Sequence, residues 1–200
     1  MTARIHPTAV VADSAVIGDR TQVWLHCQIR EHVRIGADCI LGKNIYVDTG
    51  VQIGDRCKIQ NNVSVFAGVT LEDGVFLGPH VCFTNDRVPR AVNPDGSLKS
   101  ATDWQITDTR VCTGAAIGAN STIVCGVTIG AWAMVGSGSV VSRSVPAYAL
   151  VYGNPARRHG WVTPRGERAV FDAAGRFVGS DGFTLRLVRD AGGERVEPVG

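Results

Sequence analysis

The sequence predicts an all-β protein, a parallel β-helix in which short strands and tight turns repeat every six residues. An apolar residue stands at every sixth position from Ile5 to Phe83, and the series resumes from Val111 to Val141. A small or β-branched residue precedes most of these by two positions, as Ala9 precedes Val11. Such a period fits no α-helix over many turns, and a β-sandwich would instead show alternation with turns every ~8–12 residues. The apolar series is Ile5, Val11, Ile17, Val23, Ile29, Ile35, Leu41, Val47, Ile53, Ile59, Val65, Leu71, Leu77, Phe83, Val111, Ile117, Ile123, Ile129, Val135 and Val141.

Each coil of the predicted helix contains three hexapeptides. Residues 18 positions apart then stack at the strand spacing of a sheet, about 4.8 Å. Glycine often follows the apolar residue, as at Gly18, Gly36 and Gly78. We expect these glycines to permit unusual backbone angles at the corners of the coil.

The repeat also predicts the domain organisation. We expect a β-helical domain over residues 1–161, with an inserted loop over 84–110 that lacks the repeat register. Residues 111–145 form further coils, and residues 162–200 form a short β appendage whose last ten residues we expect to be frayed. Long loops without secondary structure inside compact domains are usually functional, so the insertion is a candidate part of a site.

Composition narrows the function classes. The formal net charge of +2 gives no strong field toward nucleic acid or a membrane. We find no signal peptide and no apolar run long enough to span a bilayer. The six cysteines show no CxxC pair and no metal-finger spacing, so we expect reduced core residues in a cytoplasmic protein without a metal. The basic residues are mostly arginines; the lysines are Lys43, Lys58 and Lys99.

One stacked column is polar: His26, Asn44, Asn62 and His80 each lie three residues after an apolar position. They should form a strip near one corner of the coils, directly before the insertion. Solvated turn residues are the alternative interpretation, because asparagine is a common left-handed turn residue. The neighbouring segment CKIQNNVSVF adds further hydrogen-bonding side chains and favours a ligand rich in hydroxyls or phosphates.

Four segments resemble one protein family: GDRCKIQNNVSVF, GVFLGPHVCFTNDRVPRA, GANSTIVCGVTIGAWAMVGSGSVV and VPAYALVYGNPARRHGW. They are similar to the hexapeptide-repeat nucleotide-sugar N-acetyltransferases that acylate a 3-amino group. The resemblance covers about residues 5–161. It implies a left-handed β-helix, a homotrimer with active sites between neighbouring subunits, and acetyl-CoA as co-substrate. It also implies that the inserted loop reaches toward the sugar nucleotide.

The resemblance implies roles for individual residues. Asn85 of FTND is the best candidate for holding the sugar near its amine, and His80 and His26 are possible general bases. Substrate contacts are expected from Lys58, Gln60, Asn62, Asn44, Asp86 and Arg87. Backbone groups for the pantetheine arm of CoA are expected near Gly114, Ala115, Ala131, Ala133, Ser137 and Gly138. Asn154 belongs to the GNPAR turn, after which Arg157 and Arg158 would pair with CoA phosphates.

The expected reaction is direct attack of a neutral sugar amine on the thioester, without a covalent acyl-enzyme. The residues after FTN, Asp-Arg-Val-Pro-Arg, resemble the family members that act on dTDP-linked deoxysugars and favour a dTDP-3-amino-3,6-dideoxyhexose as substrate. The alternative substrate is a UDP-linked 3-amino-glucuronate. The sequence leaves the nucleotide, the hexose configuration and the acyl chain open. Three further alternatives are an acyltransferase of this fold with another small acceptor, a zinc enzyme of the β-helical carbonic-anhydrase type, and a non-catalytic trimerisation module.

Overall fold

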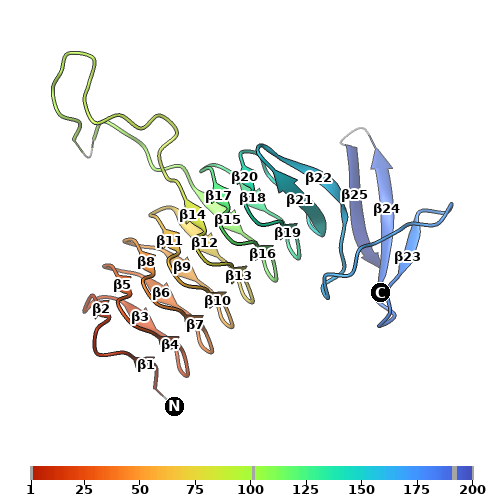
Figure 1. Ribbon diagram of the computed structural model, residues 1–200, viewed down its shortest axis with the longest axis horizontal. Helices are drawn as coiled ribbons and strands as arrows, with labels where there is room; N and C mark the ends of the chain where they lie inside the picture. The colour runs from red at the N-terminus through yellow and green to blue at the C-terminus, as the bar shows by residue number, and fades with distance from the viewer. Residues whose placement is uncertain (1, 101, 191–192, 200) are drawn as a thin grey trace.

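A computed structural model describes residues 2–100, 102–190 and 193–199. All regular elements in these ranges are strands. Short parallel strands form the three faces of a β-solenoid, a long arm leaves it midway, and a small antiparallel sheet follows at the C-terminal end (Figure 1). The predicted all-β, hexapeptide-repeat fold is therefore confirmed.

Each face of the solenoid is one sheet. The first sheet contains β1 (Arg4–Ile5), β4 (Gln22–Val23), β7 (Ile40–Leu41), β10 (Lys58–Ile59), β13 (Phe76–Leu77), β16 (Ala116–Ile117), β19 (Met134–Val135), β21 (Ala149–Gly153) and β22 (Ala156–Trp161). The second contains β2 (Val10–Val11), β5 (Gln28–Ile29), β8 (Tyr46–Val47), β11 (Ser64–Val65), β14 (Cys82–Phe83), β17 (Thr122–Ile123) and β20 (Val140–Val141). The third contains β3 (Val16–Ile17), β6 (Arg34–Ile35), β9 (Gln52–Ile53), β12 (Val69–Leu71), β15 (Thr109–Val111) and β18 (Thr128–Ile129).

Strand register follows the predicted stacking. Ile5 pairs with Val23, and Val23 pairs with Leu41, each 18 positions on. Across the insertion Leu71 pairs with Val111, 40 positions on, which is 22 more than the regular spacing of 18. β15 already begins at Thr109, so the arm occupies 84–108 and not 84–110. The solenoid also continues past residue 145, because β21 pairs in parallel with β19.

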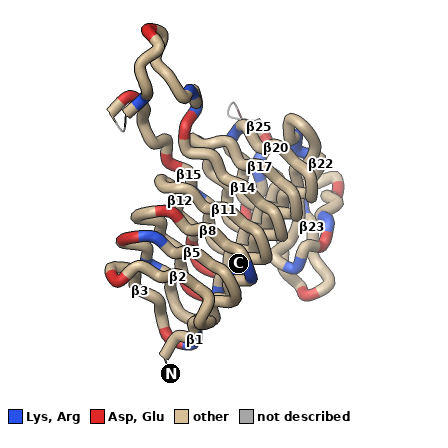
Figure 2. Tube along the Cα trace, turned by 60° about the vertical axis from the view of Figure 1, so that its left-hand side comes forward, with Lys and Arg blue, Asp and Glu red and all other residues tan. Residues whose placement is uncertain are grey.

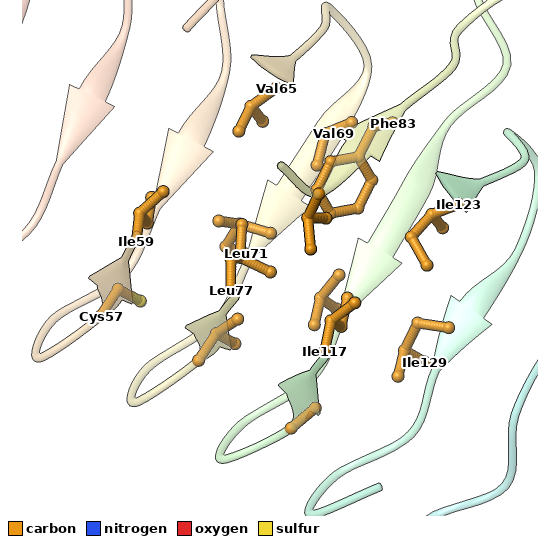
Figure 3. Close-up of a cluster of buried hydrophobic side chains, with 14 of the residues drawn as sticks. Cys57, Ile59, Val65, Val69, Leu71, Leu77, Phe83, Ile117, Ile123 and Ile129 are labelled. Atoms are coloured by element: carbon orange, nitrogen blue, oxygen red, sulfur yellow. The ribbon is translucent and has the colours of Figure 1, made fainter. Parts of the chain in front are cut away.

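The apolar series fills the interior of the solenoid (Figure 3). Leu77, Phe83, Ile117 and Ile123 are completely buried, and Figure 3 shows them stacked between the sheets. Full burial of each such side chain contributes about 1.5–3 kcal/mol. Burial is incomplete in the first coil that the structure describes, where Ile5 is 44% exposed. All six cysteines are free thiols, and four of them are buried.

The glycines after the apolar residues have a different purpose from the one we expected. Gly18, Gly78 and Gly118 do not have positive φ angles. Instead, a Cβ at Gly18 would lie 2.5 Å from the carbonyl carbon of Gly36, and one at Gly78 would lie 2.6 Å from the amide nitrogen of Ala119. These glycines are needed because successive coils stack too closely for a side chain.

The left-handed turn conformation occurs two residues after those glycines, at the second residue of each corner. Non-glycine residues occupy many of these positions, including three histidines and three asparagines. Asparagine and aspartate tolerate this conformation because their short side chains bond locally. The stacked corners therefore present a column of side chains with a fixed orientation.

Glu72 joins the coil before the arm to the coil after it. Its carboxylate accepts hydrogen bonds from Arg110 Nε at 2.6 Å and from the Thr113 amide and hydroxyl at 2.8 Å. The Thr113 hydrogen bonds, followed by those of Arg110, hold the pKa of Glu72 below its usual value, although partial burial opposes the shift. This link closes the solenoid across the inserted arm.

The C-terminal appendage is an antiparallel sheet of β23 (Arg176–Val178), β24 (Thr184–Asp190) and β25 (Gly193–Val199). β25 pairs with β24 along its whole length, so residues 193–199 are an ordered strand and not the frayed end that we expected; residues 191, 192 and 200 lie outside the described residues. The Arg158 guanidinium on β22 bonds the Glu194 carboxylate at 2.6 Å, which ties the appendage to the end of the solenoid.

Candidate functional site

The polar column (His26, Asn44, Asn62 and His80) lies at the first corner, where each coil passes from the first sheet to the second. All four residues have positive φ angles between 55° and 62°. Asn44 Nδ2 donates to Asn62 Oδ1 at 3.1 Å, and Asn62 Nδ2 lies 3.3 Å from His80 Nε2. The structure thus connects three of the four in one hydrogen-bonded ladder, with the His80 side chain exposed at its end.

A groove of about 390 Å³ on the first sheet borders this column. Lys58 and Gln60, both expected in substrate binding, lie in it beside Lys43. Lys43 and Asn61 also precede Asn44 and Asn62 directly in the chain, so the groove and the column share one edge. The groove is lined by Trp24, Leu25, Ile40, Gly42, Lys43, Lys58, Ile59, Gln60 and Asn61, and is called the lysine groove below.

The arm (residues 84–108) leaves from the second corner, between β14 and β15, and extends well away from the solenoid (Figure 1). Its base is closed by a hydrogen bond from the Thr107 amide to the Asn85 carbonyl at 3.1 Å. Asn85 and Asp86 line an open cavity of about 720 Å³ with Arg90 and Lys99. Figure 2 shows charged residues of both signs along the arm.

Arg87 points elsewhere. A Cβ added at Gly126 would lie 3.5 Å from the Arg87 guanidinium carbon, so this side chain rests on the second corner of the coil after the arm. Asp86 accepts the Val88 amide at 2.7 Å and thereby shapes the start of the arm. One chain consequently brings the polar column, Lys58 and Gln60 together, but it holds Asn85, Asp86 and Arg87 at a different corner.

The residues expected to bind pantetheine divide between two corners. Gly114, Ala115, Ala131 and Ala133 lie at or beside the third corner, whereas Ser137 and Gly138 lie at the first. The amides of Ala115 and Ala133 already donate to Cys112 and Gly130, both at 3.1 Å. Those of Gly114 and Gly138 donate to Asp73 at 2.9 Å and Ala119 at 2.7 Å. Within residues 2–100, 102–190 and 193–199, the Ala131 and Ser137 amides donate no hydrogen bond, so these two remain available to a ligand.

A smaller cavity of about 160 Å³ lies where the solenoid ends. Its cationic lining is Arg143, Arg157 and Arg158. The Arg158 guanidinium is engaged by Glu194 and lies 4.6 Å from the centre of the Trp161 ring. Among the described residues, the Arg157 guanidinium donates only to its neighbouring carbonyl, that of Ala156, at 3.1 Å, so it is the better placed of the two predicted arginines for an external phosphate. Asn154 is exposed in the preceding turn.

Sequence reasoning missed several residues at these sites. Asn120 continues the first corner in the coil after His80. The Asn120 amide donates a hydrogen bond to the Pro79 carbonyl at 2.9 Å. The insertion hid it, although carrying the apolar register from Phe83 to Ile123 would have revealed the offset. Trp24 and Lys43 line the lysine groove, and their signal was the outward position beside a polar column.

The chemistry available here is binding and positioning of polar and anionic groups. Partial burial raises the pKa of the Cys82 and Cys112 thiols, which disfavours the nucleophilic thiolate. In the described ranges, no group of three potential ligands could hold a metal ion. Likewise, no helix among the described residues is long and apolar enough to cross a membrane.

Comparison with known proteins identifies the repeat. Residues 32–67 and 113–143 match the family described as the hexapeptide repeat of succinyl-transferase. An 82-residue segment is 48% identical to dTDP-3-amino-3,6-dideoxy-α-D-galactopyranose 3-N-acetyltransferase of Aneurinibacillus thermoaerophilus, covering 38% of this chain and 43% of that protein. A 124-residue segment is 36% identical to serine acetyltransferase 4 of Arabidopsis thaliana, covering 61% of this chain and 28% of that protein.

A solved structure is similar over a longer range. It is a His→Ala mutant of GDP-perosamine N-acetyltransferase from Caulobacter crescentus, in complex with CoA and GDP-perosamine. It is 25% identical, covers 80% of this chain and 57% of that chain, and has a TM-score of 0.54. The chain spans less than half the length of the two curated relatives. Its repeat, its β-solenoid and these similarities show that the chain resembles the hexapeptide-repeat acetyltransferases, among them enzymes that acetylate nucleotide-linked amino sugars.

Proposed function

We propose that this protein is an acetyl-CoA-dependent N-acetyltransferase that acts on the 3-amino group of a nucleotide-linked amino sugar. A dTDP-3-amino-3,6-dideoxyhexose is the favoured acceptor, because the relative with 48% identity acts on such a sugar. The observation that carries the proposal is the polar column beside the lysine groove. Amide and imidazole groups suit the hydroxyls of a sugar, and ammonium groups suit phosphates.

The proposal includes assembly of a homotrimer. Asn85 and the arm cavity belong to the second corner, while the polar column belongs to the first. A single chain therefore holds the two halves of the predicted sugar site apart. The arm also exposes apolar side chains, with Leu98 82% and Val88 64% exposed. We expect the arm of one subunit to lie against the polar column of its neighbour.

Acetyl-CoA would occupy the C-terminal coils. The Ala131 and Ser137 amides are available for the carbonyl groups of pantetheine, and Arg143 and Arg157 are available for phosphates. The end of the solenoid lies four strand steps from β10 in the first sheet, about 19 Å along the axis. That length suits two extended substrates that meet between the lysine groove and the arginine-lined cavity at the end of the solenoid.

The reaction would proceed by direct transfer. The neutral amine attacks the thioester carbonyl carbon, a C–N bond forms, the C–S bond breaks, and the CoA thiolate leaves. The proton lost by the nitrogen passes to the thiolate or to water. A backbone amide would stabilise the oxyanion of the tetrahedral intermediate.

The ladder supports a positioning role for His80 in the proposed mechanism. Asn62 Oδ1 accepts from Asn44, so the Nδ2 of Asn62 faces His80. The Nε2 lone pair of His80 is then an acceptor, and its Nδ1 carries the proton. In that tautomer the ring has no free lone pair for a proton from the sugar amine. Substrate orientation therefore fits His80 better than general base catalysis.

The test is a thiol-release assay with acetyl-CoA and a panel of acceptors. The panel contains dTDP-3-amino-3,6-dideoxyglucose, its galacto epimer, the UDP-linked 3-amino-glucuronate, GDP-perosamine and serine. We expect rapid turnover of one 3-amino sugar nucleotide. Turnover of serine would support the second candidate function, suggested by the similarity to serine acetyltransferase 4, and would contradict the first. Silence with every acceptor from a protein that binds CoA would also refute the proposed acceptor class.

A further inference from the structure

The lysine groove differs from the other large cavities in its charge. Its lining contains two lysines and no acidic residue. The arm cavity combines its cations with Asp86, and the cavity below the arm combines Arg110 with Asp108. Only three lysines occur among 20 basic residues, and two of them lie in this one groove. A groove with uncompensated positive charge is suited to an anion.

The two lysines are free to bind such an anion. Lys58 projects from β10 in register with Ile40 of β7, and Lys43 lies at the corner that follows β7. They therefore belong to adjacent coils. Across the described residues, neither ammonium group takes part in an ion pair or a side-chain hydrogen bond. Two such groups on neighbouring coils match a diphosphate, whose two anionic units each need a cationic partner.

An aromatic ring lies at the other side of the same groove. Trp24 is 37% exposed, and Leu25 and Ile40 beside it are 37% and 38% exposed. The Arg4 guanidinium carbon lies 5.5 Å from the centre of the Trp24 ring, so a nucleobase would stack on the ring surface that Arg4 leaves exposed. Partly exposed tryptophan in an apolar setting is a good stacking surface for a nucleobase.

We propose that the lysine groove binds the nucleoside diphosphate of the acceptor, with the base on Trp24 and the phosphates on Lys43 and Lys58. This inference rests on the proposed function and names the part of the substrate that this surface recognises. The groove runs into the polar column through Lys43–Asn44 and Asn61–Asn62. A diphosphate held by the lysines therefore delivers its sugar to the amides of the ladder.

Isothermal titration calorimetry on the full chain tests the assignment without turnover. The probes are dTDP, UDP, GDP, thymidine, inorganic pyrophosphate and CoA. We expect the wild type to bind a nucleoside diphosphate. Lys43→Gln and Lys58→Gln should each weaken binding of that nucleotide and of pyrophosphate by roughly tenfold or more, the usual value of a charged hydrogen bond. Trp24→Leu should weaken nucleotide and thymidine binding but leave pyrophosphate unchanged.

Arg34→Gln is the matched control, because Arg34 is an exposed strand cation on the third sheet. It should change no affinity, and CoA binding should stay constant in all variants. Thermal melting confirms that each variant is folded. Normal nucleotide binding by both lysine variants would overturn the groove assignment and leave the proposed function intact. A wild type that binds CoA but no nucleoside diphosphate, and is silent with the sugar nucleotides, would instead refute the proposed function itself.

Discussion

The coils before the arm and the coils after it share one interior but present different surfaces. Leu77 and Ile117 are both completely buried and pair in register across the insertion. Outside, the earlier coils carry the polar column and the lysine groove, whereas the later coils offer unpaired backbone amides and terminal arginines. The repeat therefore determines only which residues point inward. The outward positions and the single insertion are free to differ, and they hold the two proposed substrate sites.

Removal of the arm should have the largest effect on the proposed substrate sites while leaving the shared interior unchanged. We expect replacement of residues 88–104 by Gly-Ser-Gly to lower kcat/KM for the sugar nucleotide by at least ~100-fold, because it removes Arg90 and Lys99, which line the arm cavity with Asn85 and Asp86. The hydrogen bond between Thr107 and Asn85 at 3.1 Å remains and keeps the ends together. Steady-state kinetics measures the loss.

The solenoid of the same variant should stay intact. None of the described residues in the replaced range (88–100 and 102–104) belongs to the buried core, so the melting temperature should change little. Sedimentation would show whether the assembly, which we propose to be a trimer, persists. Near-normal activity in the shortened protein would separate the arm from the site and would remove the reason for placing the site between subunits.

Phe83 tests the shared interior at the point where the chain leaves it. Its ring is completely buried and pairs in register with Ile123 of the coil after the arm. We expect Phe83→Ala to lower the free energy of unfolding by roughly 3–5 kcal/mol, measured by chemical denaturation. Phe76→Ala is the matched control, because Phe76 projects outward and is 37% exposed. Equal losses in the two variants would contradict the inward assignment of the repeat.

The fold was predictable because its signal is local and repeated. Each inward position must be apolar because it is buried, so Val23 and Val65 indicate the same repeat independently of each other. The reason for the glycines was not predictable, since a close approach such as that of Gly18 to Gly36 depends on the spacing between coils. Thr109 was wrongly included in the insertion, and β21 lies beyond the coils predicted over 111–145, because strand pairing continues where the hexapeptide pattern weakens.

The candidate site was predictable only in part. Stacking places Asn44 next to Asn62, and the ladder confirms that contact. The separation of Asn85 from this column follows from the hexapeptide count, because Phe83 stacks on Val65 in the second sheet and Asn85 therefore lies one corner after His80; we did not draw that consequence from the sequence. The partner of Arg158, Glu194, lies 36 positions away in a sheet that has no repeat, so no pattern predicted it.

Substitution of His80, at the edge of the earlier coils, distinguishes a role in positioning the substrate from a role as general base. We expect His80→Gln to lower kcat/KM by about tenfold, the value of one hydrogen bond, and to leave the pH dependence of kcat unchanged. Asn62→Ala should have a similar effect because it removes the other partner of the 3.3 Å contact. A loss of ~10²–10⁴-fold with disappearance of a limb of the pH profile would show instead that His80 is the general base.

Substitution of Glu72 tests the link between the coils before the arm and the coils after it. Its folded pKa is lowered, mainly by hydrogen bonds from Thr113, so its contribution to stability is present above the unfolded value of 4.5 and is lost as the pH falls through the folded value. We expect Glu72→Gln to lower the melting temperature by about 3–6 °C at pH 7. The difference from the wild type should shrink progressively below pH 4.5, where the wild-type carboxyl also becomes neutral. Glu31→Gln, which removes only the exposed pair with Arg30, should have a much smaller effect. A Glu72→Gln deficit that does not shrink as the pH falls and the wild-type carboxyl becomes protonated would mean that the joint depends on the shape of the side chain and not on its charge.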